Sequence, residues 1–203
     1  MSNFETIAAN PTSIFALIGV LILIFFVLYI RKMKFTTKIL VHISMMLALA
    51  IILNAIRIYH FPQGGSVTPG GMIPLLLISF RYGAGVGTLT GFLFGLMNLI
   101  QDPFIVHPVQ VLFDYPLPFM SMGIAGLGIF AGRKFLGTIA AFLGRFVFHF
   151  MSGIIFFANY APPEMSPAYY SLTVNGMMVG AEVVICLIIL KVLPLERILA
   201  AMK

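Results

Sequence analysis

The chain has 203 residues, of which 61% are hydrophobic and only 9% charged, with a mean hydropathy of +1.08. Because a soluble domain carries roughly a quarter charged residues, this composition excludes a water-soluble globule and indicates an integral membrane protein. The net charge of +6 does not indicate nucleic-acid binding, since the basic residues fall in loops on one predicted side of the membrane. The single cysteine, Cys186, excludes an internal disulfide and a cysteine-cluster metal site.

The apolar segments predict an all-α, polytopic membrane protein with seven spans. The first segment lacks the basic start and small-residue cleavage site of a signal peptide and ends on the basic run RKMK, so we interpret it as a retained helix. In chain order, the predicted spans cover residues 13–30, 39–58, 72–80, 86–100, 108–132, 136–159 and 168–190.

The basic residues between the spans predict the orientation. With the N-terminus outside, the outer segments hold only Arg57, whereas the inner segments hold ten basic residues: Arg31, Lys32, Lys34, Lys38, Arg81, Arg133, Lys134, Lys191, Arg197 and Lys203. Such an excess of positive charge marks the cytoplasmic side. We therefore expect a multi-pass protein of a bacterial plasma membrane, with its C-terminus in the cytoplasm.

Four ionisable residues stand out inside the predicted spans, where a charge costs at least about 2.5–3.5 kcal/mol. Arg145 and Glu182 each lie roughly 20 Å from the outer face, so we interpret them as a structural ion pair. His149 lies at roughly 16 Å, and such a histidine alone is more often packed against a backbone carbonyl. Asp114 lies at about 9 Å, and no lysine or arginine is predicted at that depth. Its charge therefore calls for a cationic ligand or for protonation.

The sequence around Asp114 also predicts a cavity wall. Pro116 and Pro118 lack the amide hydrogens that would bond the carbonyls of Leu112 and Asp114, and free carbonyls at membrane depth are tolerated beside protein or a water-filled cavity. An ordinary proline kink is the alternative. Aromatic residues crowd the same level, either as an interfacial belt or as a cage for an organic cation: Phe104, Tyr115, Phe156, Phe157, Tyr160, Tyr169 and Tyr170.

These features predict an outward-facing pocket for a flat, cationic or amine-bearing small molecule. Asn175, a buried amide about 10 Å deep, belongs to the same outer half of the membrane. A Gly- and Pro-rich outer loop is a candidate lid over this pocket. The lid residues are Pro62, Gln63, Gly64, Gly65 and Ser66.

Several motifs together resemble the ThiT (YuaJ) family, the thiamine-specific S-components of energy-coupling factor (ECF) vitamin importers. They occur in order between about residues 39 and 195: FPQGGSV, VHPVQVLFDYPLPF, GIAGL, FHFMSGIIFFANYA and YSLTVNG. The resemblance implies a six-helix S-component domain over residues 39–203, with residues 1–38 forming an extra transmembrane helix and a basic linker. It further implies that thiamine is captured from outside, and that the partner is an ECF module of a transmembrane coupling protein and two ATPases.

The resemblance also implies roles for individual residues. Asp114 and Asn175 would make polar contacts with the ligand. The residues that would stack on its rings are Tyr115, His149, Phe157 and Tyr170, and two more pocket positions fall on Phe104 and Arg145. The chain departs from the family in having no tryptophan, with Phe157 at one such position, and in the short carboxylate arm of Asp114.

Ser44 and Ala48, four residues apart, match the small-residue spacing by which S-components meet the coupling protein, although ordinary packing within the chain also uses this spacing. No cofactor and no nucleic-acid partner is expected, only thiamine, the ECF module and membrane lipid. The chain has no GxxxxGK[ST] phosphate loop, so it would not hydrolyse ATP itself. Two alternatives remain: a stand-alone, proton-coupled carrier of thiamine or its pyrimidine precursor, and a membrane enzyme. The enzyme has no HExxH or GxSxG motif in its favour.

Overall fold

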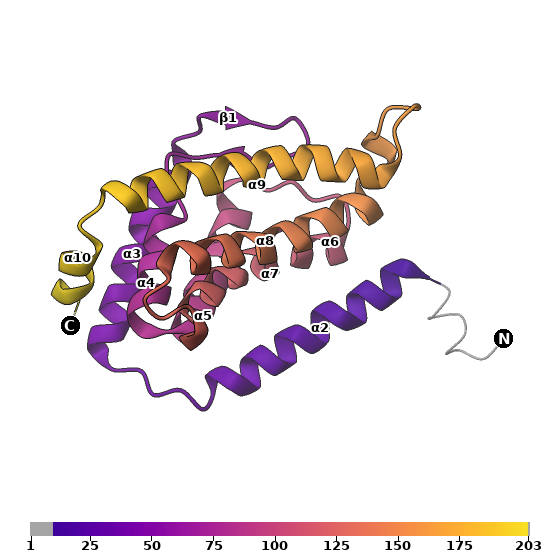
Figure 1. The fold of residues 1–203 in the computed structure, drawn as a ribbon. Helices are drawn as coiled ribbons and strands as arrows, with labels where there is room; N and C mark the ends of the chain where they lie inside the picture. Colours follow the sequence, from indigo (N-terminus) through magenta and orange to yellow (C-terminus); the bar gives the residue numbers. More distant parts are fainter. Residues whose placement is uncertain (1–9, 203) are drawn as a thin grey trace.

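A computed structural model describes residues 10–202, which form helices joined by short loops and one small β-ribbon (Figure 1). The long helices are α2 (Pro11–Ile30), α3 (Thr37–Ala55), α5 (Ala84–Gln101), α8 (Lys134–Phe156) and α9 (Pro167–Val192). The short ones are α4 (Ile73–Tyr82), α6 (Pro108–Asp114), α7 (Pro116–Met120) and α10 (Leu195–Ala201), with 3₁₀ turns η1 (Ser121–Gly126), η2 (Gly128–Phe130) and η3 (Ala158–Tyr160).

Within residues 10–202, five helices are long and apolar enough to cross a membrane: α2, α3, α5, α8 and α9. The prediction of an all-α, multi-pass membrane protein is therefore confirmed. The predicted third span is α4, which has only 10 residues. Lys203, predicted on the inner side, and residues 1–9 of the predicted N-terminal segment lie outside the described residues.

The predicted span over residues 108–132 is not one continuous helix. This segment is broken into α6, α7, η1 and η2, and Tyr115 (φ −117°, ψ −78°) separates the first two. Two prolines follow the break and withdraw two amide donors, which is why an α-helix cannot continue past Asp114. The break places the carboxylate at the C-terminal end of α6.

A face of small residues on α5 allows the broken segment to pack closely. A Cβ atom added at Gly91 would overlap the carbonyl oxygen of Phe119, and one at Gly95 would lie 2.5 Å from the carbonyl oxygen of Tyr115. Only glycine permits this approach of two backbones. Contact between α5 and α7 therefore fixes the position of the segment that follows Asp114.

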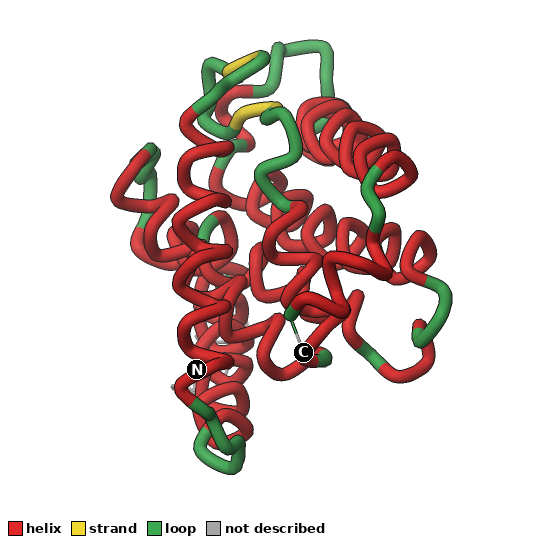
Figure 2. Tube along the Cα trace, turned by 90° about the vertical axis from the view of Figure 1, so that its left-hand side faces the viewer, coloured by secondary structure: helices red, strands yellow, loops and turns green. Residues whose placement is uncertain are grey.

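The predicted lid loop is in fact a small antiparallel hairpin, which we call the 59–67 hairpin. Its strands β1 (Tyr59–His60) and β2 (Ser66–Val67) pair with Tyr59 opposite Val67 (Figure 2). Gly64 and Gly65 close the turn at φ 86° and 81°, a region that favours glycine. Phe61 and Val67 are buried in the main core, so the hairpin is anchored to the bundle.

Helix α2 lies along one side of the bundle (Figure 1). Most of its surface is exposed, and only Gly19 and Phe26 are buried. Gly19 lies against the side chains of Leu112 and Phe113 on α6, and Phe26 belongs to a core cluster with Phe113. The extra helix thus contacts the segment that carries Asp114.

Helix α10 returns to the end of the bundle that carries most of the basic residues. Nε of Arg81 and the hydroxyl of Tyr82 donate to the carbonyl oxygen of Met202 at 3.2 Å and 3.0 Å. Lys134, the first residue of α8, forms an ion pair with Glu196 of α10. The 59–67 hairpin follows the opposite end of α3, so the hairpin and the basic residues lie at different ends of that helix.

Candidate functional site

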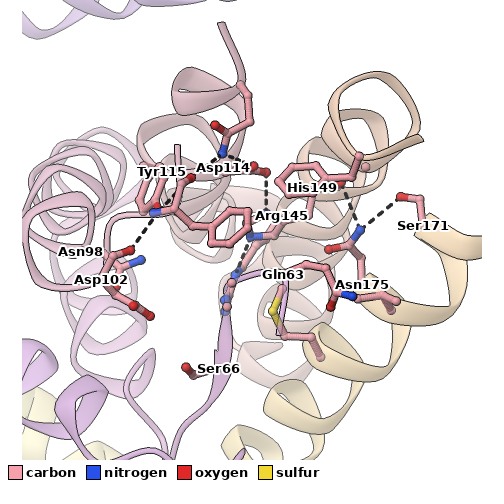
Figure 3. A pocket seen from close by; sticks show the side chains of 18 of the residues that line it. Gln63, Ser66, Asn98, Asp102, Asp114, Tyr115, Arg145, His149, Ser171 and Asn175 are labelled. Atoms are coloured by element: carbon pink, nitrogen blue, oxygen red, sulfur yellow. Dashed lines mark hydrogen bonds and ion pairs between the residues drawn. The ribbon is translucent and has the colours of Figure 1, made fainter. Parts of the chain in front are cut away.

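A pocket opens between the 59–67 hairpin, the turn after α5, the α6–α7 break and helices α8 and α9 (Figure 3). Its empty volume, including the part open to solvent, is about 880 Å³. Its walls include every predicted ligand contact: Phe104, Asp114, Tyr115, Arg145, His149, Phe157, Tyr170 and Asn175. Four of the five predicted lid residues also line it, whereas Pro62 does not.

Asp114 is held by two neutral hydrogen-bond donors. Nε2 of Gln110 donates to Oδ2 at 2.6 Å, and Nδ1 of His149 lies 3.3 Å from Oδ1. The other ring nitrogen of His149, Nε2, accepts from Nε of Arg145 at 3.4 Å. An imidazole that accepts at one nitrogen carries its hydrogen on the other. His149 therefore donates to Asp114 as a neutral ring.

Arg145 and Glu182 form the predicted ion pair, with Nη1 of Arg145 on Oε2 of Glu182. Both side chains are buried, and the second carboxylate oxygen accepts from the hydroxyl of Thr68 at 2.8 Å. The guanidinium also lies 4.9 Å from the ring centroid of Phe119. The pair is thus compensated internally, as a buried ion pair must be.

The acidic groups in and next to the pocket differ in how their charge is compensated. Asp102 pairs with Arg57 at 3.3 Å, and Glu182 pairs with Arg145. Asp114, in contrast, forms no ion pair with any lysine or arginine of residues 10–202. The pocket therefore carries one negative charge that its own walls do not neutralise, which suits a cationic ligand.

Aromatic rings form the wall next to the opening. Phe104 and Phe157 stack with centroids 5.9 Å apart and planes inclined by 23°, and Tyr160 lies 5.5 Å from Phe157. Phe156 points elsewhere and stacks on His107, and Tyr169 is 59% exposed. The predicted aromatic group therefore divides into pocket residues and outer residues.

Two predicted contacts also shape the pocket itself. The hydroxyl of Tyr115 donates to the carbonyl of Asp102 at 2.9 Å and accepts from the amide of Phe104 at 2.6 Å, which fixes the turn after α5. Nδ2 of Asn175 donates to the carbonyl of His149 at 3.2 Å and to Oγ of Ser171 at 3.1 Å. Both bonds use the amide nitrogen, so the amide oxygen remains available as an acceptor.

Several lining residues were not among the sequence predictions: Asn54, Asn98, Asp102, Gln110, Phe119, Gly153, Ser171, Val174 and Met178. Asn54 and Asn98 join α3 to α5 through a 2.8 Å hydrogen bond, and their amides inside apolar helices were the signal that could have found them. No three His, Cys, Asp or Glu side chains in the described part of the chain are grouped to hold a metal ion.

The fold and the pocket define a polytopic helical membrane protein with a binding site for a small organic molecule. Residues 40–201 match the model of a family described as thiamine transporter protein (Thia_YuaJ). The chain therefore belongs to this family, and helix α2 precedes the matched residues.

Relatives agree with this assignment. The chain is 38% identical to the thiamine transporter ThiT of Bacillus subtilis (strain 168) over 168 residues, covering 74% of this chain and 87% of that protein. It is 27% identical to the thiamine transporter ThiT of Lacticaseibacillus paracasei over 141 residues, covering 61% of this chain and 70% of that protein. The solved structure of ThiT from Listeria monocytogenes has the same fold, with a TM-score of 0.70 at 24% identity over 78% of this chain and 93% of that chain.

Proposed function

We propose that this protein binds thiamine in the pocket beside Asp114 and supplies it for uptake across the membrane. The observation that carries the proposal is the carboxylate of Asp114, which no lysine or arginine of residues 10–202 neutralises and which lines the same pocket as several aromatic rings. Thiamine combines a thiazolium cation with a flat aminopyrimidine. A carboxylate and ring faces together provide what such a molecule requires.

Each side chain has a role in this proposal. Asp114 compensates the positive charge, and the free amide oxygen of Asn175 accepts a hydrogen bond from the ligand. Phe157 and Tyr170 present ring faces, and the hydroxyl of Tyr170 is buried without a hydrogen-bond partner among the described residues.

The remaining predicted contacts complete the walls. His149 and Tyr115 supply further ring surface, while Phe104 packs on Phe157. Arg145 acts through His149, to whose Nε2 it donates. The 59–67 hairpin is the lid, since Gln63, Gly64, Gly65 and Ser66 line the pocket from that side.

We further propose that uptake is driven by a separate ECF module of a coupling protein and two ATPases. The support is the exposed face of α3, where Ser44 and Ala48 lie at the surface four residues apart. Small residues at this spacing let another helix approach closely within a membrane. The outer orientation of the pocket follows from the basic residues, which gather at the other end of α3 near α10.

A stand-alone, proton-coupled carrier is the second candidate, favoured by the direct contact between two titratable groups, Asp114 and His149. Proteoliposomes separate the two mechanisms. Uptake of labelled thiamine is expected only when the ECF module and ATP are both present. Uptake by this protein alone, driven by a proton gradient, would overturn the ECF proposal and support the carrier. Failure to bind thiamine at all would overturn both.

A further inference from the structure

Thr68 connects the 59–67 hairpin to the buried ion pair of Arg145 and Glu182. It follows β2 directly and is 1% exposed, and its hydroxyl donates to Oε1 of Glu182 at 2.8 Å. The hydroxyl oxygen of Thr68 also accepts a hydrogen bond from the amide of Gly71 at 3.2 Å, so this hydroxyl acts both as donor and as acceptor. This hydrogen bond joins the end of the hairpin to α9 beside the buried ion pair of Arg145 and Glu182.

Two contacts between this arm and α9, one on each side of the Thr68 hydrogen bond, are apolar. Gly65 lies against the sulfur of Met178, and Gly70 lies against the side chain of Ile189. These contacts are placed before and after Glu182 along α9, so the hairpin arm follows the helix (Figure 1). Apolar contacts of this kind permit the hairpin to slide along α9, whereas the Thr68 hydrogen bond fixes the position of the hairpin relative to Glu182.

From Thr68, an unbroken series of polar contacts leads to Asp114. Glu182 pairs with Arg145. Nε of Arg145 donates to His149 at 3.4 Å, and Nδ1 of His149 lies 3.3 Å from Asp114 (Figure 3). Arg145, His149 and Glu182 are buried, so water does not replace these contacts when one of them changes. Each member is held from two sides, so displacement of one alters the geometry available to the next.

We propose that Thr68 and Glu182 are positioning residues that couple the hairpin to the Asp114 end of the pocket. This inference rests on the proposed function, in which Asp114 anchors the ligand and the hairpin is the lid. A ligand that engages the carboxylate competes with His149. The resulting displacement of His149 alters the position of Arg145 and then of Glu182, and it reaches the hairpin at the Thr68 hydroxyl.

Hydrogen exchange on the full-length protein in nanodiscs, without ligand, tests the coupling. The readout is the exchange rate of peptides that contain the hairpin amides of Phe61 and Gly64, which are hydrogen-bonded within the hairpin. Thr68→Val and Asp114→Asn should each raise this rate roughly three- to tenfold, the effect of losing one net hydrogen bond. The double variant should exchange no faster than Thr68→Val, and Thr68→Ser should restore the wild-type rate.

Thr138→Val is the matched control, since Thr138 is equally buried but donates only to Lys134 within its own helix. It should leave the hairpin rate unchanged. Thr68→Cys, whose thiol is of similar size but only a weak hydrogen-bond donor, serves as a second variant if Thr68→Val unfolds in a thermal scan. The coupling would be overturned if the hairpin of the Asp114→Asn variant exchanged at the wild-type rate, or if the two substitutions raised the rate additively in the double variant. Because this readout needs no thiamine, a separate calorimetric titration of the wild type decides the proposed function independently.

Discussion

His149 stands between Asp114 and Arg145 and contacts both, with Nδ1 3.3 Å from the carboxylate and Nε2 3.4 Å from the guanidinium nitrogen. A neutral ring therefore separates the carboxylate from the guanidinium beyond it. Arg145 compensates Glu182 instead. The pocket consequently keeps a net negative charge at the point where the aromatic wall and the amides of Gln110 and Asn175 converge.

Breaking the buried ion pair should strongly destabilise the fold. Glu182→Gln leaves Arg145 without its counter-charge in a buried site, and removal of one partner of such a pair costs about 3–5 kcal/mol. Thermal unfolding in detergent measures the effect. Lys134→Gln is the control, because Lys134 pairs with Glu196, whose side chain is 86% exposed, and such a pair contributes about 0–1 kcal/mol. Equal melting temperatures for the two variants would contradict this prediction.

The glycine face of α5 makes a second prediction about stability. Gly91→Ala should abolish or sharply reduce folded protein, since the new Cβ atom meets the backbone of Phe119 and cannot be relieved by a side-chain rotation. Gly180→Ala on α9 is the matched control, because nothing lies within 4 Å of its Cβ position. It should be neutral or stabilising by up to about 1 kcal/mol. Size-exclusion profiles and melting curves compare the two, and a well-folded Gly91→Ala protein would refute the close packing.

Replacement of Phe157 should change ligand affinity in a graded way. Phe157→Trp should bind thiamine more tightly and Phe157→Leu more weakly, since each cation–π contact contributes about 0.5–2 kcal/mol and tryptophan is the strongest partner. Phe156→Leu is the control, because Phe156 stacks on His107 and does not line the pocket. Calorimetry measures the dissociation constants. An unchanged affinity in Phe157→Leu would remove this ring from the site.

The exposed face of α3 makes a prediction that separates binding from transport. Ser44→Leu together with Ala48→Leu should leave thiamine binding intact but abolish ATP-driven uptake, because the larger side chains prevent close approach of a partner helix. Ala181→Leu, at an exposed position on α9, should affect neither. Normal uptake by the Ser44/Ala48 variant would place the coupling surface elsewhere.

The sequence was sufficient for the features that local pattern determines. Apolar runs located the helices, and a carboxylate without a predicted cation identified Asp114 as the distinctive residue of the pocket. The equal predicted depth of Arg145 and Glu182 in the membrane also predicted their ion pair, which the structure confirms. Depth along a helix is a linear function of residue number, so it transfers directly from sequence to space.

Features that depend on contacts between distant segments were not predictable in this way. Asp114 had no predicted protein partner, because depth along separate helices does not show which side chains face each other. In the structure, the side chains of Asp114 and His149 are in contact. The sequence did not single out Thr68, since its partner Glu182 is 114 residues away. Similarly, the glycines of α5 are explained only by the backbone that packs against them.

Calorimetric titration of the purified protein with thiamine, beside the Asp114→Asn variant, tests the central claim most directly. Asparagine keeps the size of the side chain but removes its charge, and a hydrogen bond to a charged group contributes about 1.5–3 kcal/mol. We predict nanomolar binding by the wild type and at least a roughly tenfold loss in the variant. Equal affinity in the two proteins, or no binding by the wild type, would contradict the assignment of Asp114 as the anchor for thiamine.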